Sequence, residues 1–306
     1  MRSITERLTI VAAVVAIQVL VSVPAFATYP GSNGEIVYGT HGTIRAMSPN
    51  GSGDHRFSSL DNISSVSFSA DGTKAAVVNY TDRGDRIVLL DLVGHTRSIV
   101  LPAFRAPTEV LSSVALSPQS RRVAFSDGSY PQGLYTIGVD GSNLTKIARG
   151  YGNPDWGSNG RIVASNGIFH GDGERFIATM DPDGGNKTVI ATFPAVNDSW
   201  RSVYELAPSW APDASAVVFT AQRFKIVPDI WWVGADGSNL HRLTKTGDAS
   251  EAGPVFSPDG TEIVFSLLQS NATDSDLWLM APDGTNLIQL TATPAQYEYP
   301  IAWQPA

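Results

Sequence analysis

The sequence predicts an all-β fold, a six-bladed β-propeller built from four-stranded antiparallel blades. One observation is a residue, aromatic in five of six cases, that ends a short apolar run and recurs every 40 to 54 residues along the 306-residue chain. These residues are Phe68, Leu116, Trp156, Trp210, Phe256 and Trp303. A self-repeat near 45 residues, with four short apolar runs in each unit, is typical of propeller blades.

A second regularity is a turn glycine that is always followed, six positions later, by an apolar residue. The glycines are Gly51, Gly94, Gly141, Gly184, Gly237 and Gly284, and their partners are Phe57, Val100, Ile147, Ile190, Leu243 and Leu290. A fixed offset in six units indicates that each unit repeats the same hairpin. We therefore expect six blades and no residues for a seventh.

The clearest unit covers residues 254–291 and shows why each unit forms four strands. Its first two apolar runs are joined by Ser-Pro-Asp-Gly at 257–260, and its last two by Pro-Asp-Gly-Thr-Asn at 282–286. Proline presets φ, aspartate bonds to the backbone ahead of it, and glycine accepts a positive φ, so both segments favour tight turns. Short runs rich in Val, Ile, Phe and Trp between such turns predict antiparallel strands.

The first unit lacks its first strand, and the chain supplies that strand at its other end. Residues 34–38 have the pattern of a second strand, whereas residues 300–303 form a strand without a unit of its own. We expect the C-terminal strand to complete blade one and close the ring, which removes the open sheet edges that favour aggregation. Residues 28–306 then form a single domain.

Residues 1–27 have the pattern of a secretory signal peptide. Arg2 and Arg7 form a positive start, residues 8–23 an apolar core, and Ala25, Phe26 and Ala27 a small-x-small cleavage site. The alternative is an uncleaved anchor, but the apolar core of 16 residues is shorter than the roughly 20 that span a bilayer. We expect cleavage after Ala27, a secreted or periplasmic location, and no membrane span in the mature protein.

Composition excludes several classes of partner and chemistry. The chain has no cysteine, which excludes disulfides and thiolate metal sites. Its net charge is −8, and loss of the signal segment removes two basic residues and one acidic residue, which leaves −9. A nucleic acid would be repelled by this field. We expect a monomer that binds a protein or an envelope or cell-wall component.

The repeat resembles the Pro-Asp, WD40-like repeats of the TolB-like β-propeller family. The resemblance covers about residues 30–306 and is clearest at 210–219 with 229–244, and at 256–265 with 276–291. It implies a bacterial secreted or periplasmic propeller that binds a partner. The α/β domain that precedes the propeller in that family has no counterpart between Ala27 and the first blade, so the resemblance does not extend to the role of that domain.

No common catalytic motif is present in the sequence. The serine-hydrolase elbow, the zinc-protease His-Glu-x-x-His, the phosphate-binding loop and the dinucleotide fingerprint are all missing. The five histidines stand nowhere at metal-ligand spacing. This favours a non-catalytic binding module that needs no cofactor. The alternative is a carbohydrate-active hydrolase or lyase.

The predicted register divides the connections between two faces. Turns between first and second and between third and fourth strands share one side, the turn face; connections between second and third strands and between blades share the other, the loop face. Functional residues tend to lie on loops held by a rigid frame, and aromatics with arginine often anchor interfaces. The candidate binding residues of the loop face are Tyr130, Phe169, His170, Trp200, Arg201, Tyr204, Arg223, Phe224 and Tyr297.

Three glutamates recur before successive first strands and define a candidate acidic cluster: Glu205, Glu251 and Glu298. We expect them to line one sector of the channel mouth. Because clustered carboxylates repel one another, they could hold a divalent cation or a basic ligand group, or serve the alternative enzyme. The competing interpretation is structural: each glutamate accepts hydrogen bonds from a loop between blades, as a repeated device of the fold.

Overall fold

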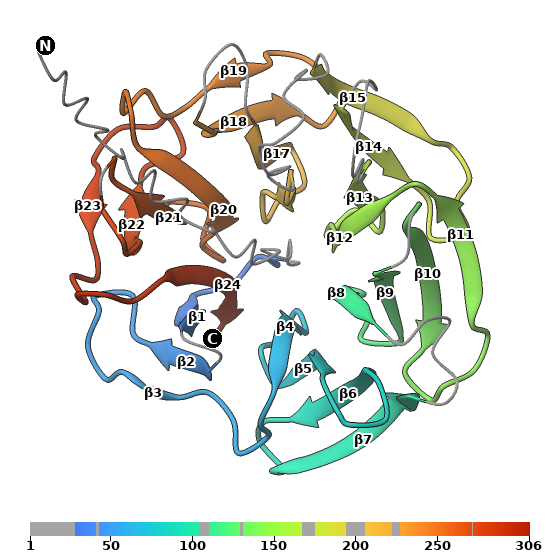
Figure 1. Ribbon diagram of the computed structural model, residues 1–306. Coiled ribbons are helices and arrows are strands. Elements are labelled where there is room, and N and C mark those ends of the chain that lie inside the picture. Colours follow the sequence, from blue (N-terminus) through green and yellow to red (C-terminus); the bar gives the residue numbers. More distant parts are fainter. Residues whose placement is uncertain are drawn as a thin grey trace, which may run out of the picture.

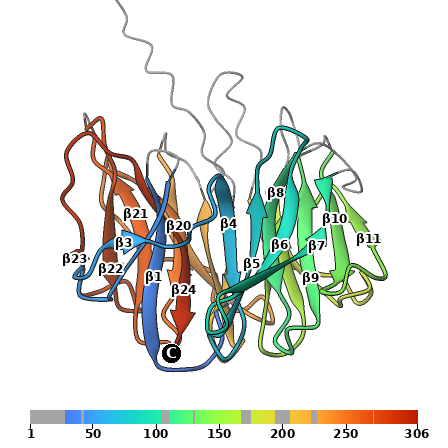
Figure 2. The same cartoon turned by 90° about the horizontal axis from the view of Figure 1, so that it is seen from below.

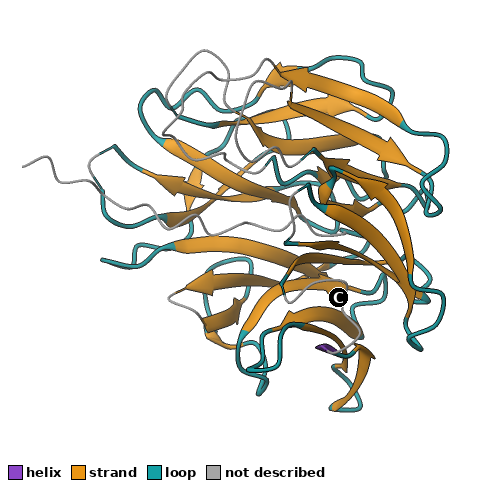
Figure 3. Cartoon of the chain, turned by 45° about the vertical axis from the view of Figure 1, so that its right-hand side comes forward, coloured by secondary structure: helices purple, strands orange, loops and turns teal. Residues whose placement is uncertain are grey.

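Six four-stranded antiparallel sheets surround a central axis, as the sequence predicts (Figure 1). The structure is a computed structural model that describes residues 28–40, 43–103, 110–128, 131–166, 175–193, 206–221, 227–270 and 272–306. Strands and loops make up almost all of this part of the chain (Figure 3). Among the described residues there is no helix long and apolar enough to cross a membrane.

Each blade is a simple meander whose first strand lies nearest the axis (Figure 1). Blade one contains β24 (Glu298–Pro305), β1 (Asn33–Thr40), β2 (Thr43–Met47) and β3 (His55–Arg56). Blade two contains β4 (Ile63–Phe68), β5 (Lys74–Asn79), β6 (Arg86–Asp91) and β7 (Thr96–Leu101). Blade three contains β8 (Leu111–Leu116), β9 (Arg122–Asp127), β10 (Gly133–Gly138) and β11 (Thr145–Arg149).

The other three blades repeat the same order. Blade four contains β12 (Gly152–Trp156), β13 (Ile162–Ser165), β14 (Arg175–Met180) and β15 (Thr188–Phe193). Blade five contains β16 (Ser209–Trp210), β17 (Ala216–Ala221), β18 (Asp229–Gly234) and β19 (His241–Arg242). Blade six contains β20 (Ser250–Phe256), β21 (Ile263–Leu268), β22 (Asp276–Met280) and β23 (Ile288–Gln289).

The C-terminal strand closes the ring, which confirms the prediction. β24 pairs antiparallel with β1, with Ile36 opposite Trp303. Trp303 is buried, and its indole Nε1 donates a hydrogen bond of 3.2 Å to the carbonyl oxygen of Gly34. The C-terminus therefore lies beside the start of β1 at the turn face (Figure 2).

The innermost strands carry a repeated irregularity that the sequence analysis did not predict. The pairing between first and second strand shifts register in every blade except blade five, where only two residue pairs are formed. Pro154 and Pro254 lie within two of these shifts. A proline cannot donate to a strand ladder, so a bulge is where an inner strand tolerates it. In the other five blades the extra residue lies in the loop-face half of the innermost strand, where a bulge bends the strand locally.

The turn glycines hold neighbouring blades together. Gly51, Gly141, Gly184, Gly237 and Gly284 all have a positive φ, and a Cβ atom on any of them would lie within 3.3 Å of a carbonyl oxygen in the preceding blade. Those carbonyls belong, in the same order, to Leu290, Val100, Ile147, Ile190 and Leu243. The turn glycine and the apolar residue of the second regularity are thus two sides of one contact, which is made between neighbouring blades and not within a hairpin.

Gly94 of blade two differs from the other five turn glycines. Its φ is not in the left-handed region, which His95 occupies instead with a φ of 51°. The atoms nearest to a Cβ on Gly94 would be those of the Asp91 carboxylate, in its own hairpin. The fixed offset to Val100 is kept in the sequence, but the contact with blade one is not formed.

Candidate functional site

Most of the predicted loop-face residues lie outside the described part of the chain. The structure places Tyr297, Glu251 and Glu298. The remaining predicted residues, which are not described, are Tyr130, Phe169, His170, Trp200, Arg201, Tyr204, Glu205, Arg223 and Phe224. For those nine, the binding role stays a prediction.

Three tyrosines lie on the loop-face side of blades one and two. Tyr297 is 45% exposed and Tyr80, just after β5, is 41% exposed. Tyr299 packs against Gly39 so closely that a Cβ there would overlap its ring. Burial, followed by the nearby Tyr80, raises the pKa of Tyr299. Sequence reasoning found only Tyr297; the signal for Tyr80 was an aromatic residue directly after a second strand.

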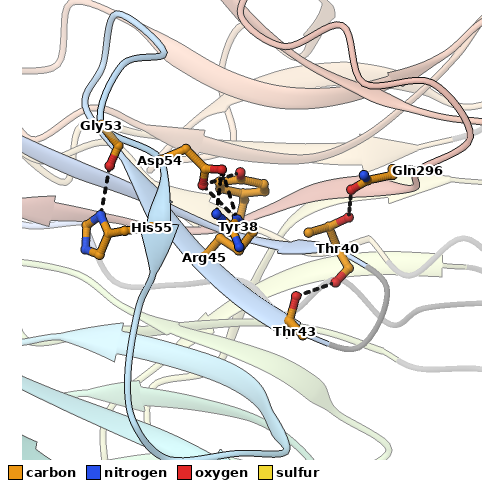
Figure 4. A network of polar contacts seen from close by, with 8 residues as sticks. All are labelled: Tyr38, Thr40, Thr43, Arg45, Gly53, Asp54, His55 and Gln296. Carbon is orange, nitrogen blue, oxygen red and sulfur yellow. Dashed lines mark hydrogen bonds and ion pairs between the residues drawn. The ribbon is translucent and has the colours of Figure 1, made fainter.

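The segment that carries Tyr297 is fastened to the end of β1. The Thr40 hydroxyl donates a 2.7 Å hydrogen bond to the side-chain oxygen of Gln296, the residue before Tyr297 (Figure 4). The Ser275 amide donates to the Gln296 carbonyl at 3.1 Å. These bonds fasten the residue before Tyr297 to both blade one and blade six.

A second group of polar contacts fixes the outer part of blade one. Arg45 donates from Nε and Nη2 to the carboxylate of Asp54, at 2.8 and 2.6 Å, and the Tyr38 hydroxyl donates to the same carboxylate at 2.8 Å (Figure 4). The hydrogen bond from Arg45 is the main cause that lowers the pKa of Asp54. This network ties the connection before β3, a strand of two residues, to β1 and β2.

Glu251 is buried in the junction between blades five and six and is held by threonine hydroxyls. Thr244 donates to its Oε2 at 3.3 Å, and Thr246 donates to its Oε1. Burial, aided by the charge of Asp229, raises the pKa of Glu251 to about 8. The folded protein therefore favours the protonated form of Glu251 at neutral pH.

Glu298 repeats this arrangement at the junction between blades six and one. It is buried, it accepts a hydrogen bond from the Thr291 hydroxyl, and burial raises its pKa. Thr291 stands seven residues before Glu298, as Thr244 stands seven before Glu251. The repetition is what the structural interpretation expects, although the donors are threonine side chains and not backbone amides. The ligand-binding hypothesis for the whole acidic cluster stays a prediction, because Glu205 is not described.

In the described ranges, no three His, Asp or Glu side chains lie close enough together to hold one metal ion. The nearest candidates, Glu251 and Glu298, each have hydroxyl partners of their own.

The first described residues cross the channel at the turn face. Thr28 and Tyr29 are both buried. The Thr28 hydroxyl donates to the carbonyl of Phe256, at the end of the innermost strand of blade six, and the Tyr29 hydroxyl donates to that of Leu116 in blade three. Blades three and six are opposite in a six-membered ring, so this segment bridges the floor of the channel.

A buried carboxylate stands beside that bridge. Asp155 accepts hydrogen bonds from the backbone amides of Trp156, at 2.8 Å, and Trp210, at 2.6 Å, and so joins the innermost strands of blades four and five. Burial raises the pKa of Asp155 to about 8. The charge of Asp155 also contributes to the raised pKa of Tyr29.

Comparison with known proteins agrees with this architecture. The family model of the TolB β-propeller domain matches residues 52–305. The "Tol-Pal system protein TolB" of Anaeromyxobacter dehalogenans strain 2CP-C is 33% identical over 114 residues, which cover 37% of this chain and 23% of that protein. The chain therefore matches less than a quarter of the length of this curated relative.

Solved structures share the fold at low sequence identity. TolB from Acinetobacter baumannii has a TM-score of 0.68 at 17% identity, over 89% of this chain and 67% of that one. The structure described as putative TolB from Agrobacterium tumefaciens has a TM-score of 0.61 at 19% identity, over 90% and 100%. An oligogalacturonate lyase in complex with manganese has a TM-score of 0.55 at 17% identity, over 87% and 75%. At these identities the likeness shows the fold alone.

Proposed function

Because the chain belongs to the family of TolB β-propeller domains, we propose that it is a secreted or periplasmic binding module without catalytic activity. In this proposal it holds a protein or an envelope component on its loop face. The name of its curated relatives, Tol-Pal system proteins, supports a protein partner. The segment at residues 1–27 supports export from the cytoplasm.

The observation that carries the proposal is the pair of exposed aromatic rings on a rigid frame. Tyr80 and Tyr297 are each more than two-fifths exposed. The segment of Tyr297 is hydrogen-bonded to two blades. Large aromatic side chains on a fixed backbone lose little entropy on binding and often dominate the energy of an interface. The predicted residues Trp200, Arg201 and Tyr204 would extend the same face.

Site-specific photo-crosslinking in cells tests the proposal with the full chain. A photoreactive phenylalanine analogue replaces Tyr80 or Tyr297 in separate variants. The matched control replaces Leu287, which is 43% exposed on the turn face. We expect the same cross-linked partner from both tyrosine positions and none from Leu287. Equal cross-linking from all three positions, or none from either tyrosine, would contradict a binding role for the loop face.

Export is tested separately by the mass of the mature protein. Cleavage after Ala27 makes Thr28 the first residue, so we expect the N-terminal peptide of protein recovered from the envelope or medium to begin at Thr28. Recovery of the chain only from the cytoplasm with residues 1–27 intact would contradict the proposed location.

The carbohydrate-active alternative gains no support from the described carboxylates. It needs an acid and a nucleophile or base at a defined separation. Glu251 and Glu298 are instead buried and hydrogen-bonded to threonines of the structural repeat. The described residues therefore favour the binding module.

A further inference from the structure

The first two residues of the predicted mature chain are buried in the structure. Thr28 and Tyr29 are 0% and 1% exposed. The Thr28 hydroxyl donates a hydrogen bond of 3.3 Å to the carbonyl oxygen of Phe256 in blade six. The Tyr29 hydroxyl donates to the carbonyl oxygen of Leu116 in blade three. Because these contacts reach two opposite blades, the ring itself sets the position of both residues.

Cleavage after Ala27 would change the chemistry of this buried segment. The nitrogen of Thr28 is an amide in the uncleaved chain. In the mature chain it becomes an α-ammonium group, with a full charge and three N–H donors. A buried charge is costly unless it is paired and hydrogen-bonded. The groups around Thr28 therefore decide whether the cleaved chain can keep this segment in place.

Asp155 is a buried carboxylate that lacks a cationic partner in the described part of the chain. It is fully buried, and both hydrogen bonds that it accepts come from backbone amides, those of Trp156 and Trp210. None of the ion pairs between described residues includes it. Burial and then the charge of Asp155 raise the pKa of Tyr29, so this carboxylate lies within electrostatic reach of the buried segment.

The place of Asp155 in the ring puts it on the same arc of the channel floor as Thr28. Its partner Trp210 ends the innermost strand of blade five, β16. Phe256, which holds Thr28, ends the innermost strand of blade six, β20, and these two strands are in contact. Tyr29 connects the segment to blade three, the neighbour of the blade that carries Asp155. The carboxylate thus lies between the two ends of the bridge.

A second, independent observation points to a missing hydrogen-bond donor on this arc. The Oγ atom of Ser209, on β16, is buried and has no hydrogen-bond partner among the described residues. The equivalent serine of blade two, Ser67, accepts the amide of Leu116 in the next blade at 2.9 Å. Leu116 and Phe256 have the same place in their blades, so the repeat directs Ser209 toward the strand end that holds Thr28. An ammonium group there would supply the missing donor.

We propose that cleavage after Ala27 completes the channel floor, because the new α-ammonium group of Thr28 pairs with the carboxylate of Asp155 and donates to Ser209. The pair rests on the cleavage that the proposed function includes, but it goes beyond export and binding, since it makes cleavage a step in folding. The uncleaved chain has an amide in place of the ammonium group and lacks this charge-assisted contact. It is therefore less stable than the mature chain.

The test compares two N-termini on the mature chain, residues 28–306, which contains all six blades. One form has a free α-amine, and the other is acetylated at the Thr28 nitrogen, which removes the charge. Thermal unfolding at neutral pH measures the difference. We expect acetylation to lower Tm by about 5 °C or more, because the loss of one partner leaves the carboxylate buried and unpaired.

Two variants show whether the loss comes from the pair. In Asp155→Asn, acetylation should lower Tm by less than about half as much, since the carboxylate is already absent. Asp85→Asn is the matched control, because Asp85 is also a buried carboxylate that accepts the amide of an innermost strand, that of Leu111 at 2.8 Å. Acetylation should cost as much in this variant as in the natural chain.

The pKa of the α-amine gives a readout that the bulk of an acetyl group does not affect. The carbon chemical shifts of Thr28, followed by NMR as the pH rises, report this titration in the free form. An α-amino group ordinarily titrates at roughly 7.7–8.0. We expect a pKa at least about one unit higher in the natural mature chain. In Asp155→Asn it should fall below the ordinary value, because burial alone favours the neutral amine.

The pair is refuted if acetylation leaves Tm unchanged, if it costs as much in Asp155→Asn as in the natural chain, or if the α-amine of the mature chain has an ordinary pKa. A different first residue in the exported protein would contradict the proposed cleavage itself, which the mass of the N-terminal peptide reveals. None of these variants alters Tyr80 or Tyr297, so the cross-linking experiment tests the loop face independently.

Discussion

Gly184 shows how the absence of a side chain lets the backbones of two blades pack closely. Its φ is +88°, and a Cβ atom there would overlap the carbonyl group of Ile147 in the preceding blade. Gly94 has the same place in the sequence repeat but neither the positive φ nor the contact with its neighbour. The two glycines therefore form a matched pair for measuring what the contact between blades contributes.

We expect Gly184→Ala to lower the free energy of unfolding by about 2–3 kcal/mol, from the disfavoured φ and the overlap together. Gly94→Ala should cost less, about 1 kcal/mol or below, because its φ lies outside the left-handed region and the atoms nearest to the added methyl group belong to the side chain of Asp91. Urea unfolding of both variants measures the difference. Similar losses at the two positions would show that the contact between blades does not cause the effect.

Glu251 predicts that the protein is less stable in mild alkali than in mild acid. Its pKa in the folded chain, about 8, lies above its ordinary value of 4.5. The folded state therefore holds an extra proton between these two values, and the free energy of unfolding falls as pH rises through that window, by up to about 1.4 kcal/mol per pH unit. Denaturant unfolding at pH 5.5 and pH 8.5 measures the loss.

The variant Glu251→Gln removes the titrating group while it keeps the shape of the side chain. We expect it to reduce the difference in stability between the two pH values, with Asp155 responsible for much of the remainder. An unchanged difference in this variant would show that Glu251 does not titrate in the folded protein.

Single residues also mark where sequence reasoning stops. The three glutamates were found by their spacing, but the threonines that hold Glu251 and Glu298 were not, although each first threonine stands seven residues earlier. Tyr80 had a local signal, its place directly after a second strand, but its proximity to Tyr299 of β24 had none, because the two residues are far apart in the sequence. Spacing reveals repetition, whereas the partner of a buried group depends on packing.

At the scale of strands, a single side chain joins two blades where the pairing is shortest. β16 forms only two residue pairs with β17. Asp155 of β12 adds to this short pairing, because its carboxylate accepts a hydrogen bond from the amide of Trp210 in β16 as well as from that of Trp156. The innermost strand of blade five is thus held partly by its neighbour.

We expect Asp155→Ala to cost about 2–4 kcal/mol, since it leaves two buried amides without an acceptor. Asp155→Asn keeps one acceptor and should fall between this variant and the natural protein. Thermal unfolding ranks the three. An asparagine variant less stable than the alanine variant would contradict this account of the site.

The number and type of strands could be predicted because turns and apolar alternation are local signals. The bulges of the innermost strands could not, since a shifted register appears only when two strands are aligned. Pro154 and Pro254 were a usable hint, because proline within a central strand requires such an irregularity.

For the molecule as a whole, closure of the ring depends on the last strand. We expect Trp303→Ala to lower the free energy of unfolding by about 3–5 kcal/mol, because the side chain is fully buried between β1 and its neighbours. The half-buried Trp278 of β22 is the control and should cost less. Urea unfolding compares the two. Equal losses in the free energy of unfolding would show that the closing strand contributes no more to stability than a strand within a blade.

The way in which β1 and β24 meet also decides how the protein responds to force. Asn33, at the start of β1, is opposite Pro305, at the end of β24, so the chain enters β1 and leaves β24 at the same end of the sheet. A pull on the two ends of the chain would load the hydrogen bonds between these strands one after another, as in opening a zip, and not all together as in shear. The pairing of β1 with β24, which closes the ring, would then be the part of the fold that yields first under force.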